Sequence, residues 1–151
     1  MVGSKSVTEI VNGTIESVKA VLPFDIYIEK PNVIQEPLIQ ADLGVLIGMT
    51  GDMEGRLLIE GTRECISSIG SSMFGMPIGD EMLESFTGEL ANMIAGNLAT
   101  IVSGREVHID ITPPTVIVGA TKLYGFDRAF KVPVSLLQEE TLYLILMIEN
   151  S

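Results

Sequence analysis

The sequence predicts an α+β (mixed α/β) domain in which helices pack on a β-sheet and one long helix stays exposed along one face. Three observations predict this fold class. Apolar residues recur at helical spacing near the N-terminus, a central segment has the pattern of a helix of about seven turns, and strand patterns lie before and after it. The elements follow one another without a linker, so residues 1–151 are expected to form a single domain.

The first part of the chain predicts a helix followed by strands. Apolar residues between Val7 and Leu22 repeat at helical spacing, so a helix is expected from about Ser4 to Leu22, where Pro23 stops it. The strands expected next are Phe24–Glu29, Val33–Ile39, Leu43–Met49 and Arg56–Glu60, with Thr50–Gly55 as the turn of a hairpin between the last two.

Two helices are predicted in the middle of the chain. Thr62 suits the N-cap of the first, which runs to about Phe74. The side chains expected on its buried side are Ile66, Ile69, Ser72, Met73 and Phe74. The second helix covers Asp80–Arg105, with Asp80 as the N-cap and Gly104 in a left-handed conformation at the C-terminal end.

The last part of the chain returns to strand patterns. The expected strands are Val107–Ile111, Thr115–Gly119, Tyr124–Val132 and Thr141–Ile148. Pro133 has no backbone N–H, so it is expected to limit the pairing of the strand before it. Residues Leu142–Ile148 are apolar at every position, which predicts a central strand covered on both faces of the sheet.

Composition excludes several classes of partner and location. The chain has 9 basic and 20 acidic residues, a formal charge of −11, which argues against nucleic acid and anionic membranes. A single cysteine, Cys65, allows no internal disulfide and fits a reducing compartment. The longest apolar run is far shorter than the roughly 20 residues of a membrane span, and no signal peptide is evident, so no membrane insertion and a cytoplasmic location are expected.

Few residues could serve an active site carried by this chain alone. His108 is the only histidine and is expected to face solvent or cap a strand, which excludes a zinc site of several histidines and cysteines. No Gly-x-Ser-x-Gly elbow or phosphate-binding loop is present, and Cys65 is expected to be buried and inert. The candidate core methionines are Met73, Met76, Met82 and Met93. No metal site is therefore expected.

The long helix has two different faces. The residues expected on its core face are Leu83, Phe86, Leu90, Met93, Ile94 and Ile101. The small or polar residues of the opposite face are Ser85, Gly88, Glu89, Asn92, Gly96, Ala99 and Ser103. Each glycine destabilises a helix by roughly 1 kcal/mol relative to alanine, so these glycines suggest a close approach by another helix or by a partner protein.

A chain without its own active site can still complete the active site of another protein. In GTPases a carboxamide orients the attacking water, and a partner can supply the missing group. Ser85, Glu89 and Asn92 are four and three residues apart, so they line up on the helix, where Asn92 could orient a water and Glu89 could pair with a lysine. A second Glu-x-x-Asn pair, Glu9 and Asn12, is interpreted as a solvated helix face.

The segment Glu84–Asn97, ESFTGELANMIAGN, resembles the signature helix of the CheC/CheX/FliY phosphatase family of bacterial chemotaxis. That signature is Asp or Ser, three residues, Glu, two residues and Asn, which Ser85, Glu89 and Asn92 match. Two further blocks, Ile47–Ile59 and His108–Gly119, resemble the segments on either side, and the order matches the CheX type. CheC-type members carry two signature helices, whereas this chain has one convincing copy.

The resemblance implies a phosphatase that acts on a phosphorylated CheY-like response regulator. The phosphoaspartate and the Mg²⁺ would belong to the regulator, so no cofactor is expected in this chain. Glu89 would pair with the regulator's active-site lysine, Asn92 would hold the attacking water, and Ser85, Gly88 and Gly96 would contact the partner. A homodimer is also implied. The alternative is a non-catalytic adaptor of the same fold, which binds a response regulator or the flagellar switch through the same polar stripe.

Overall fold

The computed structural model describes residues 4–35, 37–40, 42–136 and 140–149. Its centre is an eight-stranded sheet whose four inner strands follow the order β9-β10-β5-β4. These strands span Arg128–Ser135, Thr141–Ile148, Gly55–Gly61 and Leu43–Gly51 in that order. Every strand pair recorded among the described residues is antiparallel, and β4 and β5 form the expected hairpin.

Each edge of this sheet is made of two short strands in place of one long strand. On one side β1 (Tyr27–Ile28) and β2 (Asn32–Ile34) both pair with β9. On the other side β6 (Ile109–Ile111) and β7 (Thr115–Val118) both pair with β4. A separate ribbon consists of β3 (Leu38–Gln40) and β8 (Thr121–Leu123).

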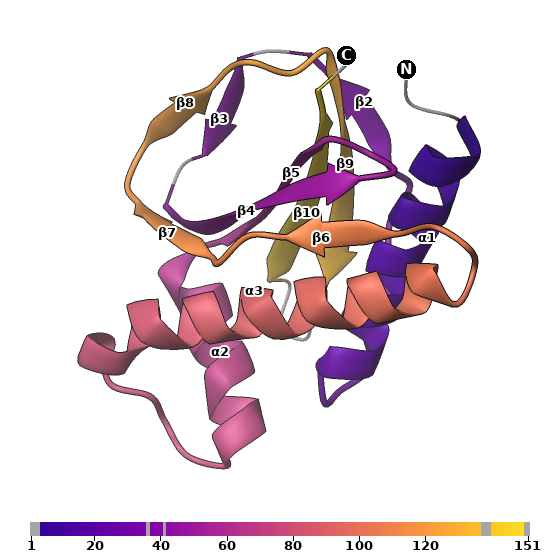
Figure 1. Ribbon diagram of the computed structural model, residues 1–151. Coiled ribbons are helices and arrows are strands. Elements are labelled where there is room, and N and C mark those ends of the chain that lie inside the picture. The colour runs from indigo at the N-terminus through magenta and orange to yellow at the C-terminus, as the bar shows by residue number, and fades with distance from the viewer. Residues whose placement is uncertain (1–3, 36, 41, 137–139, 150–151) are drawn as a thin grey trace.

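The helices α1 (Ser4–Val21), α2 (Arg63–Phe74) and α3 (Asp80–Ser103) cover one face of the sheet, and the β3–β8 ribbon covers part of the other (Figure 1). Strand β10 lies between both layers. Leu144 and Leu146 belong to the core under the helices, whereas Ile145 and Met147 belong to the core under the ribbon. The prediction of a central strand that is covered on both faces is therefore confirmed, as is the α+β fold class.

Two strand predictions were wrong because strand pairing depends on neighbours as well as on local pattern. The strand expected at Val33–Ile39 is divided between β2 and β3, which pair in different sheets, with Pro37 between them and residue 36 outside the described ranges. Strand β8 was not predicted. Strand β9 is displaced from the expected Tyr124–Val132 and includes Pro133.

Pro133 fits inside β9 because of the side toward which its missing N–H would point. Its carbonyl oxygen accepts a hydrogen bond of 3.0 Å from the Glu29 backbone N–H, just after β1. The amide and the carbonyl of one strand residue point to the same side, so the missing donor faces the short edge strands and not β10. The ladder between β9 and β10 therefore stays complete past the proline.

Helix ends were predicted correctly where a side chain makes the cap. The Thr62 side chain accepts a 3.0 Å hydrogen bond from the Cys65 backbone N–H at the start of α2, and Gly75 ends this helix with a φ of 71°. In α3 the N-cap is Gly79, so Asp80 is the first helical residue. Gly104 keeps a right-handed conformation, and Glu106 takes the left-handed one with a φ of 65°.

Glu60 is a buried carboxyl group on β5, with only 7% of its surface exposed. Burial raises its pKa, and the charge of Lys131 opposes that shift. Since the fold favours the neutral form, the ionised carboxylate destabilises the protein above the raised pKa, and this penalty vanishes below the unfolded pKa of about 4.3. We expect Glu60→Gln to raise the free energy of unfolding by roughly 0.5–2 kcal/mol at neutral pH, with the gain lost in acid.

Thermal unfolding from acidic to neutral pH measures this effect, with Glu54→Gln as the matched control because Glu54 is exposed on the same hairpin. A Glu60→Gln variant that is less stable than the wild type at neutral pH would show that the attraction of Lys131 outweighs burial.

Candidate functional site

The exposed face of α3 carries Ser85, Glu89 and Asn92, as the helical spacing predicted. Phe86 and Leu90 are buried beneath them, with 6% and 0% of their surface exposed. Within the described part of the chain, the three polar side chains have no hydrogen-bond or ion-pair partner. They are therefore free to contact another molecule.

Helix α1 packs against the core side of α3 and holds it in place. The Ser17 hydroxyl is buried and donates a 2.6 Å hydrogen bond to the carbonyl oxygen of Ile94, two residues after Asn92. Gly13 permits this close packing, because a methyl group there would come within 2.9 Å of the side chains of Leu98 and Val102. The turn that carries Asn92 is thus a rigid support for the exposed side chains.

The other end of α3 is held by α2. The rings of Phe74 and Phe86 meet edge to face with their centroids 5.6 Å apart, and Arg63 lies 3.8 Å from the carboxylate of Glu84. Both residues of that ion pair are substantially exposed, so its contribution to stability is small.

Two glycines of the stripe have different surroundings. Gly88 is buried, and a methyl group there would lie 3.3 Å from the Val116 side chain on β7. The close approach at Gly88 thus comes from a strand of the same chain and not from another helix, and Gly88 is covered before any partner arrives. At Gly96 a methyl group would meet no atom within 4 Å, so nothing in the described chain requires a glycine there.

Strand β7 reaches α3 because the sheet edge is held at Thr112. The Thr112 backbone N–H donates to the Gly48 carbonyl oxygen at 2.9 Å, and the Thr112 hydroxyl accepts from the Gly48 N–H at 2.8 Å. The Pro113–Pro114 pair follows directly, so β6 and β7 remain separate strands on the same neighbour, β4.

The second Glu-x-x-Asn pair lies on α1, apart from the stripe of α3. Asn12 is exposed and Glu9 is half-buried. Arg105 is nearby: it forms an ion pair of 2.6 Å with Glu16, and Glu9 is among the charges that raise its pKa. Glu9 therefore has a cation of its own chain close by, whereas Glu89 forms no ion pair with any described residue.

Several of the expected core side chains are exposed in the structure. Met93 was assigned to the core face but is 40% exposed, because it lies only about 40° around the helix from Glu89. Met76 and Met82 are 64% and 60% exposed, so their assignment as core methionines was wrong. Phe74, expected on the buried side of α2, is 56% exposed, and Ser72 is exposed as well. The exposure of Met82 and Met93 could have been predicted from the sequence, because helical spacing places both close to the polar Glu89 on the helix surface.

The described residues offer no reactive cysteine, no cluster of metal ligands and no membrane-spanning helix. Cys65 is buried as predicted, and burial raises the pKa of its thiol to about 12, which keeps it protonated and unreactive. His108 is exposed beside β6. Among the described residues, no three His, Cys, Asp or Glu side chains gather as metal ligands would, and no helix is long and apolar enough to cross a membrane.

Comparisons with known proteins agree with this fold. A family model described as chemotaxis phosphatase CheX matches residues 43–125. The CheY-P phosphatase CheX of Thermotoga maritima is 33% identical over 151 residues, which cover 97% of each chain.

Two solved structures share the fold. A CheC-like superfamily protein from Shewanella sp. PV-4 aligns with a TM-score of 0.78 and 23% identity, over 98% of this chain and 99% of that one. The CheX-CheY-BeF3-Mg²⁺ complex from Borrelia burgdorferi aligns with a TM-score of 0.79 and 22% identity, over 99% and 100% of the two chains. Since the family model spans more than half of the sequence and the Thermotoga relative nearly all of it, the chain belongs to the CheX family of chemotaxis phosphatases.

Proposed function

We propose that this chain accelerates the hydrolysis of the phosphoaspartate of a CheY-type response regulator. The observation that carries the proposal is the exposed set of Ser85, Glu89 and Asn92, which has no partner among the described residues and lies on a helix that α1 holds from the core side. The relative from Thermotoga is a CheY-P phosphatase, and the structure from Borrelia is a complex of CheX with CheY, which supports a regulator as the partner.

Water is the nucleophile of this reaction, so the chain needs to supply a group that positions the water and not a nucleophilic side chain. The oxygen of water attacks the phosphorus, the bond from phosphorus to the aspartate oxygen breaks, and the carboxylate leaves as inorganic phosphate forms. The regulator supplies the phosphoaspartate and the Mg²⁺. The carboxamide of Asn92 would accept a hydrogen bond from the water and hold it in line with the bond that breaks, as a glutamine does in GTPases.

Glu89 would bind the regulator and not the water. It lies three residues before Asn92, so both side chains point from the same helix face into one neighbouring surface. Its partner would be the lysine of the regulator's active site, and this ion pair would set the position of the helix. Ser85, one turn earlier, would have a supporting role. That the chain brings no metal of its own and forms a homodimer stays a prediction.

The test is the rate of phosphate release from CheY-type regulators of the same genome, phosphorylated with a small phosphodonor, with and without this protein. We expect a faster release that saturates with regulator concentration. If the protein binds a phosphorylated regulator but never changes its rate of dephosphorylation, the chain is an adaptor and the phosphatase proposal is wrong.

Gly96→Ala tests whether the partner approaches the helix at Gly96. A methyl group there would meet no atom of the described residues within 4 Å, so we expect the free energy of unfolding to rise by about 0.5–1 kcal/mol, because alanine favours a helix over glycine. Phosphate release should nevertheless fall several-fold if the regulator packs against this backbone. Urea unfolding and phosphate release measure both effects, and wild-type activity in Gly96→Ala would remove Gly96 from the interface.

The matched control is Gly88→Ala, where the new methyl group would meet Val116 at 3.3 Å. Its stability should gain less than that of Gly96→Ala, since the neighbouring strand must give way.

A further inference from the structure

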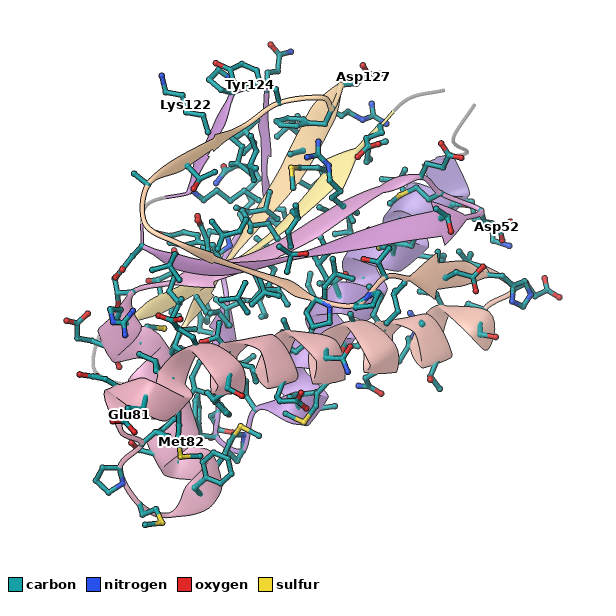
Figure 2. The ribbon with its side chains drawn as sticks, turned by 60° about the vertical axis from the view of Figure 1, so that its left-hand side comes forward. Asp52, Glu81, Met82, Lys122, Tyr124 and Asp127 are labelled. Atoms are coloured by element: carbon teal, nitrogen blue, oxygen red, sulfur yellow. The ribbon has the colours of Figure 1, made fainter. Side chains whose placement is uncertain are left out.

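Three large apolar side chains lie exposed beside the polar stripe of α3. Met82 is 60% exposed, Phe74 is 56% exposed and Met93 is 40% exposed. Phe74 contacts Phe86 edge to face, and Met82 lies one turn before Phe86 on α3, so Phe74 and Met82 border the same ring. We call Phe74, Met82 and Met93 the apolar rim. Figure 2 shows Met82 and Glu81 at the first turn of α3, near the end of α2.

Helix geometry ties this rim to Glu89. Met82 precedes Glu89 by seven residues and Met93 follows it by four, so the three side chains deviate by only about 20–40° around the axis. Along the axis, Met82 lies about 10 Å from Glu89 and Met93 about 6 Å, at a rise of 1.5 Å per residue. A protein that covers Glu89 must therefore come close to both methionines.

The usual size of a protein–protein interface also indicates that a partner bound at Glu89 would cover the apolar rim. A stable complex buries about 800 Å² on each partner, which is a disc of roughly 16 Å radius. A disc of that size centred between Glu89 and Asn92 includes the first turns of α3 and the apolar rim. Continuity with the polar stripe thus identifies which molecule would cover the rim.

We propose that the apolar rim is the docking surface for the receiver domain of the phosphorylated regulator, and that this receiver carries an apolar patch beside its phosphorylation site. The proposal rests on the proposed function and adds a division of labour to it. Phe74, Met82 and Met93 supply affinity, whereas Asn92 supplies the chemistry. Methionine suits such a surface, because its flexible thioether adapts to the shape of a partner.

The charge of this face explains why affinity would need apolar contacts. Asp80, Glu81 and Glu84 are exposed around the same end of α3, and the whole chain carries a formal charge of −11. The phosphoryl group of the regulator is negative as well, and the Mg²⁺ of the regulator offsets only part of that charge. Apart from the ion pair assigned to Glu89 and the partly exposed Arg63, this face offers little electrostatic attraction, so burial of apolar surface would supply most of the affinity.

The experiment compares the Met82→Gln/Met93→Gln double variant with Tyr124→Gln. Glutamine keeps the length and the helix propensity of methionine but removes the apolar surface. Tyr124 is 56% exposed, and Figure 2 places it at the opposite end of the molecule from Met82. We expect the double variant to raise KM for the phosphorylated regulator at least tenfold while kcat stays within about twofold, and we expect Tyr124→Gln to change neither value.

Several outcomes would overturn the docking surface. An unchanged KM in a folded double variant does so, and so does a loss of kcat at constant KM. If the double variant instead abolishes self-association of the protein, the rim is covered by a second copy of this chain and not by the regulator. Circular dichroism and thermal unfolding establish that each variant is folded.

Direct titration separates this proposal from the proposed function. The probe is the regulator loaded with beryllofluoride and Mg²⁺, which mimics phosphorylation but cannot be hydrolysed. If the wild type binds this regulator and the double variant binds at least tenfold more weakly, the docking surface stands even where no dephosphorylation is found. If the wild type and the double variant bind equally, the docking surface is wrong while the phosphatase activity is unaffected.

Discussion

Asn92→Ala is expected to lower kcat for stimulated phosphate release by about 10²–10³-fold, the usual effect of removing one positioned hydrogen-bonding group from a transition state. The physical reason is that the carboxamide acts on the water only while the phosphoryl group is being attacked. Binding of the phosphorylated regulator should therefore change little. Phosphate release over a range of regulator concentrations, together with titration of the beryllofluoride-loaded regulator, measures the two quantities separately.

The variant should also remain folded, which keeps this result interpretable. Asn92 is exposed and unpartnered within the described chain, so its replacement should cost less than about 1 kcal/mol of stability. The matched control is the Glu9→Ala/Asn12→Ala double variant on α1, which has the same spacing and is expected to be silent. If Asn92→Ala keeps the wild-type rate, the water-orienting role is wrong. If the α1 variant loses activity instead, the site lies on the other helix.

The sequence predicted those elements whose signals are local. Thr62 was predicted as the N-cap of α2, and a hydroxyl cap of this kind acts within a few residues. The apolar run of β10 predicted its central place, because only a strand covered on both faces can bury so many side chains. Strands β2, β3 and β8 have three residues each, and their pairing depends on partners far along the chain, which local patterns do not reveal.

The difference between local signals and contacts with distant elements also explains which parts of the candidate site were predicted correctly. The spacing of Ser85, Glu89 and Asn92 placed them on one face, because helical periodicity alone determines which side chains line up. Hydrophobicity, however, does not tell whether another element covers a side chain. Met82 and Met93 were therefore assigned to the core although no element covers them fully. Gly88 and Gly96 also look alike in sequence, and only the packing of β7 on Gly88 distinguishes them.

Glu89→Gln is expected to lower kcat/KM for phosphate release by about 10–100-fold, mostly through a weaker association. Loss of one partner from a close intermolecular charge pair weakens binding by roughly this factor or more. Glutamine keeps the shape of the side chain, so the effect reports its charge. Salt screens the attraction between charges at an interface. The ratio of the wild-type kcat/KM to that of Glu89→Gln should therefore fall toward one as salt is added.

Glu81→Gln is the matched control for this prediction. Glu81 is exposed on the same helix two turns before Glu89, and its substitution changes the net charge by the same amount. An effect of overall charge would appear equally in both variants, whereas an ion pair with a lysine of the regulator appears only in Glu89→Gln. Equal values of kcat/KM for the two variants at every salt concentration would therefore refute the ion pair. A decrease confined to Glu89→Gln that salt reduces would locate the lysine of the regulator opposite the middle of α3.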